Sequence, residues 1–343
     1  MRVLVVTDAW RPQVNGVVRT IEHLMEHAPA FGVEIELLTP DRFRTLPMPT
    51  YPEIRLSLAR AGAVAKMIDA SNADHVHVST EGPLGLAARR ACIRQGRPFT
   101  TSYHTRFPEY LRRRAPIPER WTYAGLRRFH NAGAGTMVAT PSLRKELAER
   151  GFLRLMHWSR GVDAERFKPD PAARAFDHLP KPIFLYVGRI APEKNVEGFL
   201  SLDLPGTKVV VGDGPQRSDL EAAFPDAHFT GTLEGEALAK AYASSDVFVF
   251  PSRTDTFGIV VLEALASGVP VAAFPVTGPV DILEGSGAGV LDVDLRKAAL
   301  AALDVPREKA RALALSHGWR EATKLFVDNV RQVIAETTPD RAA

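Results

Sequence analysis

Two carboxylates, Asp255 and Glu263, stand eight positions apart in the segment FPSRTDTFGIVVLEALASG. The residues before this pair indicate a buried strand and those after Asp255 a helix, so Asp255 precedes the helix and Glu263 lies inside it. The N–H groups at a helix start bind anions, and here they belong to Gly258, Ile259 and Val260. A carboxylate accepts hydrogen bonds from vicinal hydroxyls, which suits Asp255 to a sugar and Glu263 to a ribose.

The simpler interpretation of this segment is an ordinary amphipathic helix with polar ends. In that case the helix dipole alone would favour Asp255, and Glu263 would be a surface residue. Glu263 weakens this interpretation, because positions 260–262 and 264–265 around it are all apolar. A carboxylate on so apolar a helix usually has a partner, and we therefore predict a site.

Two cations follow a predicted strand in the second half of the chain, in the segment YVGRIAPEKN. Arg189 can hold a phosphate through two parallel hydrogen bonds and Lys194 supplies a point charge, so this pair suits a diphosphate. Pro192 and Glu193 mark a helix start, where cations are unfavourable unless an anion binds. A solvated pair of cations is the alternative.

The first half offers polar candidates at expected strand ends. Asn15 and Gly16 form a tight turn into a helix, where glycine lets a phosphate or sugar approach the backbone; a turn glycine without a ligand is an equal alternative. His104 stands where another strand stops, although a lone histidine is more often structural than catalytic. Glu81 ends the neighbouring strand, and the convergence of two polar groups favours a site for both.

Several other chemistries lack their sequence motifs. No G-x-G-x-x-G follows the first strand and no P-loop occurs, which disfavours dinucleotide and P-loop phosphate binding. No H-E-x-x-H, EF-hand loop or histidine cluster appears, and the DVD of Asp292 to Asp294, which follows the strand-like GAGVL, is interpreted as a turn. The single cysteine, Cys92, excludes an intramolecular disulfide and a Cys-based zinc site and fits a reducing cytoplasm. We therefore expect no metal and no other cofactor.

The elements that must position these residues follow a regular alternation. Short β-branched runs alternate with helical stretches, which is typical of parallel sheets built from βαβ units. The predicted strands cover residues 2–7, 34–39, 75–80, 99–104, 135–140, 182–188, 207–213, 227–231, 246–251 and 270–274. The predicted fold class is α/β, with two Rossmann-like doubly wound parallel-sheet domains at 1–168 and 169–318. A further helix at about 319–338 can pack back on the first domain.

The composition is that of an ordinary globular chain, with 45% hydrophobic and 24% charged residues among 343. Apolar runs fall short of the ~18 residues that span a bilayer, so we expect a soluble protein, or one attached at most to a membrane surface. The net charge of +3 is uneven: residues 1–170 hold 26 Lys and Arg against 17 Asp and Glu, and residues 171–343 hold 17 against 23. Opposite charges suggest that the two domains face different partners.

Five motifs, in order, resemble those of retaining glycosyltransferases of family 4, which have the GT-B fold. They are NGVVRT, GVDAERFKP, GR…EKN, VVGDGP and PSRTDTFGIVVLEALASGVPV, and the last resembles the E-x7-E region of that family. The resemblance runs from Met1 to about Thr323. It implies a hexosyltransferase with two Rossmann-like domains that face a crevice, and a nucleotide-diphosphate sugar as the donor.

By this resemblance, the second domain holds most of the donor. Arg189 and Lys194 would neutralise the diphosphate, and Glu263 would hold the ribose hydroxyls. Asp255, with the amides that follow Phe257, would grip the transferred sugar.

The first domain would supply two further contacts by the same resemblance. Gly16 would contact the phosphate or the sugar, and His104 would contact the sugar near its anomeric centre and assist catalysis. The family retains anomeric configuration, and the favoured mechanism is front-face, with the leaving phosphate helping to deprotonate the acceptor. Such a mechanism needs neither an enzyme nucleophile nor a metal, because Arg, Lys and helix N-termini manage the charge of the diphosphate.

The sequence departs from the family pattern at two of these positions. The first acid of the pair is Asp255 where glutamate is usual, and the first-domain loop reads Asn15-Gly16 where Gly-Gly is commoner. An aspartate is one methylene shorter, so the identity of the donor sugar does not carry over. VNGVVRT, SYHTRF and RTDTFG most resemble the members that glycosylate lipids, such as mannosyl, glucosyl or sulfoquinovosyl transferases.

A basic and aromatic segment, residues 104–131, bears on the acceptor. Its arginines are interleaved with Phe, Tyr, Leu and Trp, a mixture that suits an anionic lipid surface. An arginine-rich solvated helix face is the alternative, and nothing resembles a nucleic-acid module. We expect peripheral attachment to the inner face of the membrane. The residues predicted on the acceptor or membrane side are Glu81, Arg106, Arg112, Arg113, Arg114, Trp121, Arg127 and Arg128.

The predicted function is transfer of a hexosyl group from a nucleotide sugar to an acceptor hydroxyl, on a membrane lipid such as diacylglycerol or a glycolipid. A sugar-nucleotide epimerase of the same fold is one alternative, which would need neither an acceptor nor a basic and aromatic surface. Transfer to a soluble acceptor and non-catalytic binding of a nucleotide sugar are the others.

Overall fold

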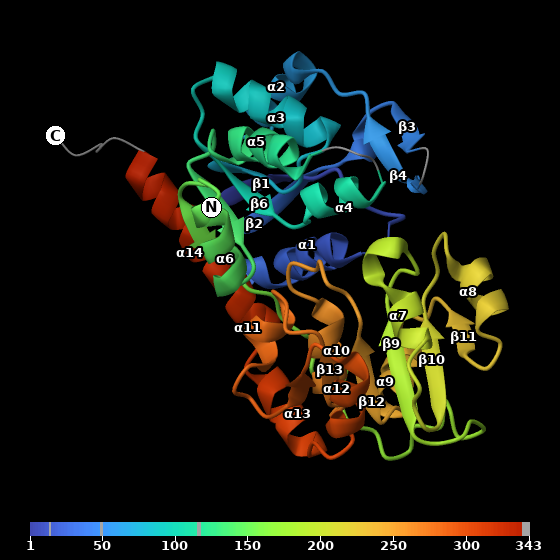
Figure 1. Cartoon of the computed structure of the whole chain (residues 1–343). Coiled ribbons are helices and arrows are strands. Elements are labelled where there is room, and N and C mark those ends of the chain that lie inside the picture. Colours follow the sequence, from blue (N-terminus) through green and yellow to red (C-terminus); the bar gives the residue numbers. More distant parts are fainter. Residues whose placement is uncertain (14, 49–50, 115–117, 338–343) are drawn as a thin grey trace. The chain divides into compact units, whose positions relative to one another are not determined.

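The structure is a computed structural model that describes residues 1–13, 15–48, 51–114 and 118–337. The chain forms two compact units (Figure 1). One contains the N-terminal part of the chain and the C-terminal helix, and the other contains the part between them. Unit 1 holds Met1–Ser159 and the residues from Trp319 onward, and unit 2 holds Arg160–Gly318. The sequence boundary at residue 168 thus lies a short way inside unit 2, and the C-terminal helix belongs to unit 1.

Unit 1 is built on a six-stranded sheet in the order β2-β1-β5-β6-β7-β8. Every neighbouring pair of strands in it runs parallel. Its strands are β1 (Arg2–Val6), β2 (Glu34–Leu38), β5 (His75–Val78), β6 (Phe99–Tyr103), β7 (Gly135–Val138) and β8 (Leu155–His157). The five strands predicted in this half are all present. The pattern does not predict β8, because three residues at a sheet edge are too short to show a period.

The helices of unit 1 include one that comes from the far end of the chain. They are α1 (Gly16–His27), α2 (Ala61–Ala70), α3 (Pro83–Arg94), α4 (Phe107–Arg114), α5 (Glu119–His130), α6 (Pro141–Glu149) and α14 (Trp319–Thr337), with short 3-10 turns η1 (Ala28–Phe31) and η2 (Pro40–Arg42). A separate antiparallel hairpin, which the sequence analysis did not predict, pairs β3 (Thr45–Met48) with β4 (Tyr51–Ser57). Phe326 and Val330 of α14 join Ile21 of α1 and Val3 of β1 in one buried cluster, so α14 completes the core of unit 1.

Unit 2 repeats the architecture with a second six-stranded sheet, in the order β11-β10-β9-β12-β13-β14. All its neighbouring strands are parallel. Its strands are β9 (Ile183–Val187), β10 (Thr207–Val211), β11 (His228–Gly231), β12 (Val247–Phe250), β13 (Val271–Ala273) and β14 (Gly289–Leu291). Its helices are η3 (Pro192–Lys194), α7 (Val196–Leu200), α8 (Arg217–Ala223), α9 (Gly235–Ala243), α10 (Ile259–Ala266), α11 (Pro279–Leu283), α12 (Leu295–Ala302) and α13 (Arg307–Leu315). The five predicted strands are present, and β14 falls within the strand-like GAGVL.

Each sheet has a point where the strand order reverses. β1 lies between β2 and β5, and β9 lies between β10 and β12. At such a point the connections of two parallel neighbours run to opposite sides, which leaves room for a ligand beyond their carboxyl ends. The residues that follow β1 and β5 in unit 1, and β9 and β12 in unit 2, are therefore the first places to look for a site.

We expect Phe326→Ala to lower the free energy of unfolding by about 3–5 kcal/mol, because the buried ring leaves a cavity when it is removed. The ring centroid of Phe326 lies 5.0 Å from that of His77 and 4.9 Å from that of Trp158, both in unit 1. Denaturant unfolding followed by circular dichroism measures the change. Leu153→Ala, at a side chain that is 52% exposed, is the control and should stay within about 0.5 kcal/mol of the wild type. Equal effects of the two substitutions would show that α14 is not part of this core.

Candidate functional site

Two loops meet at the switch point of unit 2. One follows β9 and carries η3, and the other follows β12 and leads into α10. The side-chain amide of Asn195 donates to the carbonyl of Pro251 at 3.0 Å, and the Thr254 hydroxyl donates to the carbonyl of Glu193 at 3.4 Å. These bonds tie the loops together, so residues far apart in the sequence are held at one place.

The loops bring together a predicted cation and a predicted carboxylate. The Lys194 ammonium lies 2.6 Å from Oδ1 of Asp255, and both side chains are largely shielded from solvent. The other carboxylate oxygen, Oδ2 of Asp255, is buried and has no hydrogen-bond partner within the described part of the chain. A buried acceptor without a donor costs roughly 1–3 kcal/mol, so a ligand hydroxyl at this oxygen would be stabilised.

The start of α10 follows this pair directly. Gly258 is the N-cap residue and has φ of +93°, a conformation that glycine adopts without strain. Phe257 before it is buried, whereas Gly258, Ile259 and Val260 are half-buried. The first N–H groups of a helix have no acceptor within the helix, so these amides are suited to an oxygen-rich ligand.

Glu263 lies inside α10, as predicted, and is only 2% exposed. Its Oε2 accepts a hydrogen bond of 2.9 Å from the hydroxyl of Tyr242 on α9. The sequence rule that such a carboxylate has a partner is therefore confirmed. The identity of the partner was not visible in the sequence, because Tyr242 belongs to a different helix.

The loop that carries Arg189 is fixed by backbone contacts. Arg189 is half-buried, and its carbonyl accepts a hydrogen bond of 2.8 Å from the Tyr186 hydroxyl. Gly212, in the VVGDGP motif after β10, has φ of +138°, and a Cβ there would lie 1.9 Å from the Gly188 carbonyl oxygen. A side chain at Gly212 would displace this loop. The two glycines of the motif were a signal for this close approach.

In unit 1, Asn15 has a local structural task. Its Oδ1 accepts from the backbone N–H groups of Val17 and Val18, at 3.0 and 3.1 Å, and so caps the helix that begins at Gly16. This cap gives Asn15 a structural role at the position where the resemblance led us to expect glycine.

The other two candidates of unit 1 have separate partners. His104 is half-buried, and its Nε2 lies 3.0 Å from the Ser79 hydroxyl at the end of β5. Glu81 is instead buried against His130, whose Nε2 lies 3.0 Å from Oε1 of Glu81. The other ring nitrogen of His130 lies 2.9 Å from the Thr101 hydroxyl. Glu81 thus belongs to an internal network and not to an acceptor-facing surface.

Asp8, after β1, is a residue that the sequence analysis missed. Its carboxylate accepts from the backbone N–H groups of Leu84 and Gly85, at 2.8 and 3.0 Å, and from the Thr80 hydroxyl at 2.9 Å. Burial raises the pKa of Asp8 above its usual range, although these hydrogen bonds oppose the shift. Asp8 therefore fixes the loop after β1 to the start of α3. The sequence signal that could have identified Asp8 is its position directly after a predicted strand.

Within the basic segment, Arg106 does not lie on a surface. It is 8% exposed, and its guanidinium lies 2.6 Å from Oε2 of Glu146 and 3.2 Å from Oε1 of Glu109. Burial alone would lower the pKa of Arg106, but the hydrogen bond and charge of Glu146, with the charge of Glu109, raise it above the usual value. The placement of Arg106 on the membrane side is therefore corrected: it is a buried partner of two carboxylates.

Four of the other predicted membrane-side residues of the segment do face solvent. Trp121 is 65% exposed, and Arg127 and Arg128 are exposed on the same helix, α5. Arg112 on α4 is exposed and pairs with Glu119 at 3.0 Å. The side chains of the two remaining predicted residues, Arg113 and Arg114, lie outside the described residues.

Across residues 1–13, 15–48, 51–114 and 118–337, no helix is both long and apolar enough to cross a membrane.

We expect Gly258→Ala to lower the free energy of unfolding by roughly 1–2 kcal/mol, because φ of +93° is unfavourable for a residue with a Cβ. The added Cβ would also lie 3.2 Å from Cζ of Phe250 and 3.3 Å from Cγ2 of Val261. Denaturant unfolding measures the effect. Gly62→Ala is the matched control: its Cβ would meet no atom within 4 Å, and alanine in α2 should be neutral or stabilising. A Gly258→Ala protein as stable as the wild type would show that the start of α10 accepts a side chain.

The two units match models of glycosyltransferases. Residues 14–166 match the model described as Glycosyltransferase Family 4, and residues 181–305 match that of Glycosyl transferases group 1. Among solved structures, the chain is similar to sucrose-phosphate synthase from Thermosynechococcus elongatus, with a TM-score of 0.77 and 18% identity over 98% of this chain and 100% of that chain. This likeness confirms the predicted fold class, two parallel-sheet α/β domains of the GT-B type.

Curated relatives extend the match across both units. A GDP-mannose-dependent alpha-mannosyltransferase of Mycobacterium tuberculosis is 34% identical, over 85% of this chain and 83% of the relative. The sulfoquinovosyl transferase of Arabidopsis thaliana is 34% identical over 79% of this chain and 58% of the relative. A GDP-mannose-dependent alpha-(1-6)-phosphatidylinositol monomannoside mannosyltransferase of Mycobacterium tuberculosis is 32% identical over 47% of this chain and 49% of the relative. With matches of this extent in both units, the chain belongs to glycosyltransferase family 4 and is a hexosyltransferase, as its motifs predicted.

Proposed function

We propose that this hexosyltransferase moves a hexosyl group from a nucleotide-diphosphate sugar to a hydroxyl of a membrane lipid, with retention of the anomeric configuration. One observation carries the donor part of the proposal. The buried Oδ2 of Asp255 has no hydrogen-bond partner in the described part of the chain, and Oδ1 of the same carboxylate contacts the Lys194 ammonium. A hydroxyl-rich group joined to a phosphate supplies a donor to the first and an anion to the second.

The covalent structure of a nucleotide sugar fits this arrangement. Its sugar is bonded directly to the diphosphate, so the residues for sugar and diphosphate must be neighbours, as Asp255 and Lys194 are at 2.6 Å. We assign Arg189 to the diphosphate as well, because its loop leaves the same strand, β9. The amides that follow Phe257 hold the sugar, and Glu263 holds the ribose hydroxyls.

The proposal also assigns roles to two residues of unit 1. Gly16 contacts the phosphate or the sugar, and His104, oriented by Ser79, contacts the sugar near its anomeric carbon. The bond from the anomeric carbon to the leaving phosphate oxygen breaks while the bond to the acceptor oxygen forms on the same face. The leaving phosphate takes the proton of the acceptor hydroxyl. The transfer itself needs no metal, because cations and helix amides stabilise the charge on the diphosphate.

GDP-mannose is the first donor to test, because a relative with 34% identity is named for its dependence on it. A screen of nucleotide sugars by thermal stabilisation identifies the preferred donor, since a ligand at 100 times its Kd adds about 2.7 kcal/mol to the free energy of unfolding.

We expect Asp255→Asn to lower kcat/KM about 10- to 100-fold with the preferred donor, because a hydrogen bond to a charged group is worth roughly 1.5–3 kcal/mol. Transfer of the labelled sugar to total membrane lipid measures the rate. Asp203→Asn, at a carboxylate that is 94% exposed, is the control and should retain the wild-type rate. An unchanged rate in Asp255→Asn would contradict the sugar-binding role. A labelled isomer of the nucleotide sugar, with no labelled lipid, would indicate an epimerase.

We further propose that α4 and α5 bind an anionic membrane surface at the cytoplasmic face. Trp121, Phe107 and Leu111 are exposed large side chains of these helices, and exposed Arg127 and Arg128 add positive charge. A tryptophan beside arginines suits the interface between acyl chains and anionic headgroups. The relative named for phosphatidylinositol monomannoside supports a lipid acceptor.

We expect Trp121→Ser to weaken binding to anionic vesicles about tenfold, because the lost insertion of a large apolar side chain is worth about 1.4 kcal/mol or more. Co-sedimentation with vesicles of phosphatidylcholine and phosphatidylglycerol measures the affinity. Leu315→Ser, at a 59% exposed side chain on α13 of unit 2, should not change it. If the wild-type protein sediments equally with pure phosphatidylcholine, the proposed preference for an anionic surface fails. If it sediments with neither vesicle, the membrane proposal fails and a soluble acceptor is favoured.

A further inference from the structure

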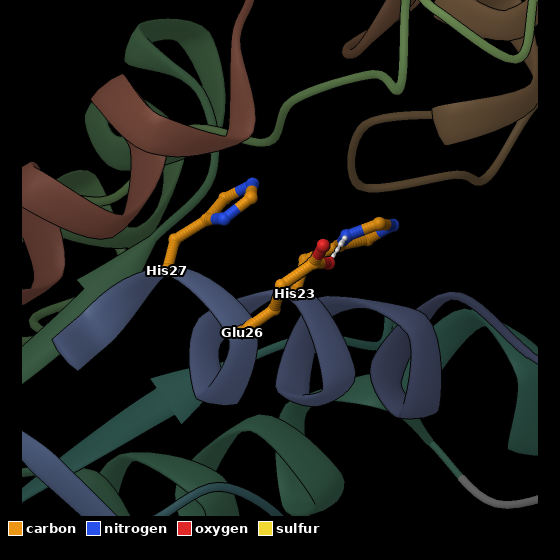
Figure 2. A group of neighbouring side chains, drawn as sticks. All are labelled: His23, Glu26 and His27. Atoms are coloured by element: carbon orange, nitrogen blue, oxygen red, sulfur yellow. Dashed lines mark hydrogen bonds and ion pairs between the residues drawn. The ribbon is translucent and has the colours of Figure 1, made fainter. Parts of the chain in front are cut away.

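We propose that helix α1 carries a binding site for a divalent transition metal, formed by His23, Glu26 and His27. These residues have the spacing H-x-x-E-H, which places all three on one face of a helix. One ligand atom of each side chain lies within 4.8 Å of those of the other two (Figure 2). This group corrects the expectation that no histidine cluster is present: the acid directly precedes the second histidine, an arrangement that the H-E-x-x-H motif does not cover.

The side chains of the group contact one another, and His23 also contacts Trp319 of α14. A ring nitrogen of His23, Nδ1, lies 3.1 Å from Oε2 of Glu26, which keeps these two groups together. The His23 ring also stacks on the indole of Trp319, with centroids 4.5 Å apart and an interplanar angle of 18°. His27 lies one turn further on, with its ring centroid 6.1 Å from that of His23. Stacking removes rotamer freedom from His23 before any metal arrives, and this lowers the entropic cost of binding.

The opposite face of α1 makes the site rigid. Val18, Ile21 and Leu24 are buried, so the backbone beneath the three ligands is anchored in unit 1. His23, Glu26 and His27 remain at least partly exposed, so an ion can reach them. Only side-chain rotation is then needed to close the ligand set.

The ligand types select the class of metal. Two imidazole nitrogens and one carboxylate oxygen suit Zn²⁺, Cu²⁺, Ni²⁺ or Co²⁺, whereas Mg²⁺ and Ca²⁺ prefer oxygen ligands alone. Zinc bonds of about 2.0–2.1 Å in a tetrahedron place ligand atoms about 3.4 Å apart. The His23–Glu26 contact, at 3.1 Å, is close to this separation, and His27 must approach by a side-chain rotation. Water would fill the remaining position.

The three ligands include none of the residues assigned to sugar transfer, and the existence of the site does not depend on the proposed function. A metal that joins residues on successive turns stabilises the folded helix relative to the unfolded chain, because the same three residues are not held together after unfolding. The expected role is therefore to stabilise α1. A solvated pair of His23 and Glu26 that binds no metal is the competing interpretation.

The test uses the whole protein without a purification tag, because added histidines would bind the same metals. Isothermal titration with Zn²⁺ should show one ion per chain, and Co²⁺ should give a visible d–d absorption spectrum. His27→Ala and Glu26→Gln should each weaken Zn²⁺ binding by at least about tenfold, since even the loss of an outer-shell partner costs about 10- to 100-fold in affinity. Glu26 is 63% exposed, so its replacement leaves the fold intact.

A second pair of histidines supplies the matched control. His178 and His228 of unit 2 have ring centroids 5.7 Å apart, and His178→Ala should leave the Zn²⁺ affinity unchanged. Zn²⁺ should also raise the Tm of the wild-type and His178→Ala proteins but not that of His27→Ala. The proposal is overturned if wild-type protein binds no Zn²⁺ at micromolar concentrations. It is equally overturned if both α1 variants bind as tightly as the wild type, or if only His178→Ala loses binding.

Discussion

The ion pair between Lys194 and Asp255 joins two loops that follow neighbouring parallel strands of unit 2. β9 and β12 are parallel neighbours at a reversal of strand order, so their connections run to opposite sides. The bond from Asn195 to Pro251 and the ion pair, at 3.0 and 2.6 Å, both hold the loops together. In the proposed function one partner binds a phosphate and the other a sugar hydroxyl, so this pair would fix where the two halves of a donor meet.

The remaining groups of unit 2 are positioned by tight backbone packing around that pair. Gly258 turns the chain from the loop of Asp255 into α10 through a conformation that few residues adopt. The body of α10 is almost entirely buried, so the helix cannot rotate, and Glu263 is fixed in direction. Because Gly212 has no side chain, the loop after β10 can pack closely against the loop after β9. Polar chemistry at this edge thus depends on an apolar helix and on glycines that carry no chemistry themselves.

The sequence predicted the elements better than the contacts. Runs of β-branched residues predicted ten strands, because a buried parallel strand is apolar along its whole length. The need of Glu263 for a partner was also predictable, since burial of a carboxylate has a known cost. That the partner is Tyr242, and that Lys194 pairs with Asp255, depends on tertiary packing across 21 and 61 residues. The local periodicity of the sequence does not identify such tertiary partners.

The basic segment shows the same limit, and here the limit affects the argument for membrane binding. Composition counts every arginine alike, yet Arg106 is buried between carboxylates and Arg112 is paired with Glu119. The excess of positive charge in the first half therefore overstates the charge that faces a lipid surface, because paired cations attract anionic headgroups less. The exposed indole of Trp121 is uncharged, so its contribution does not depend on this charge balance. In the proposed membrane contact, apolar insertion must then contribute alongside electrostatic attraction, and the two can be separated because salt screens only the second.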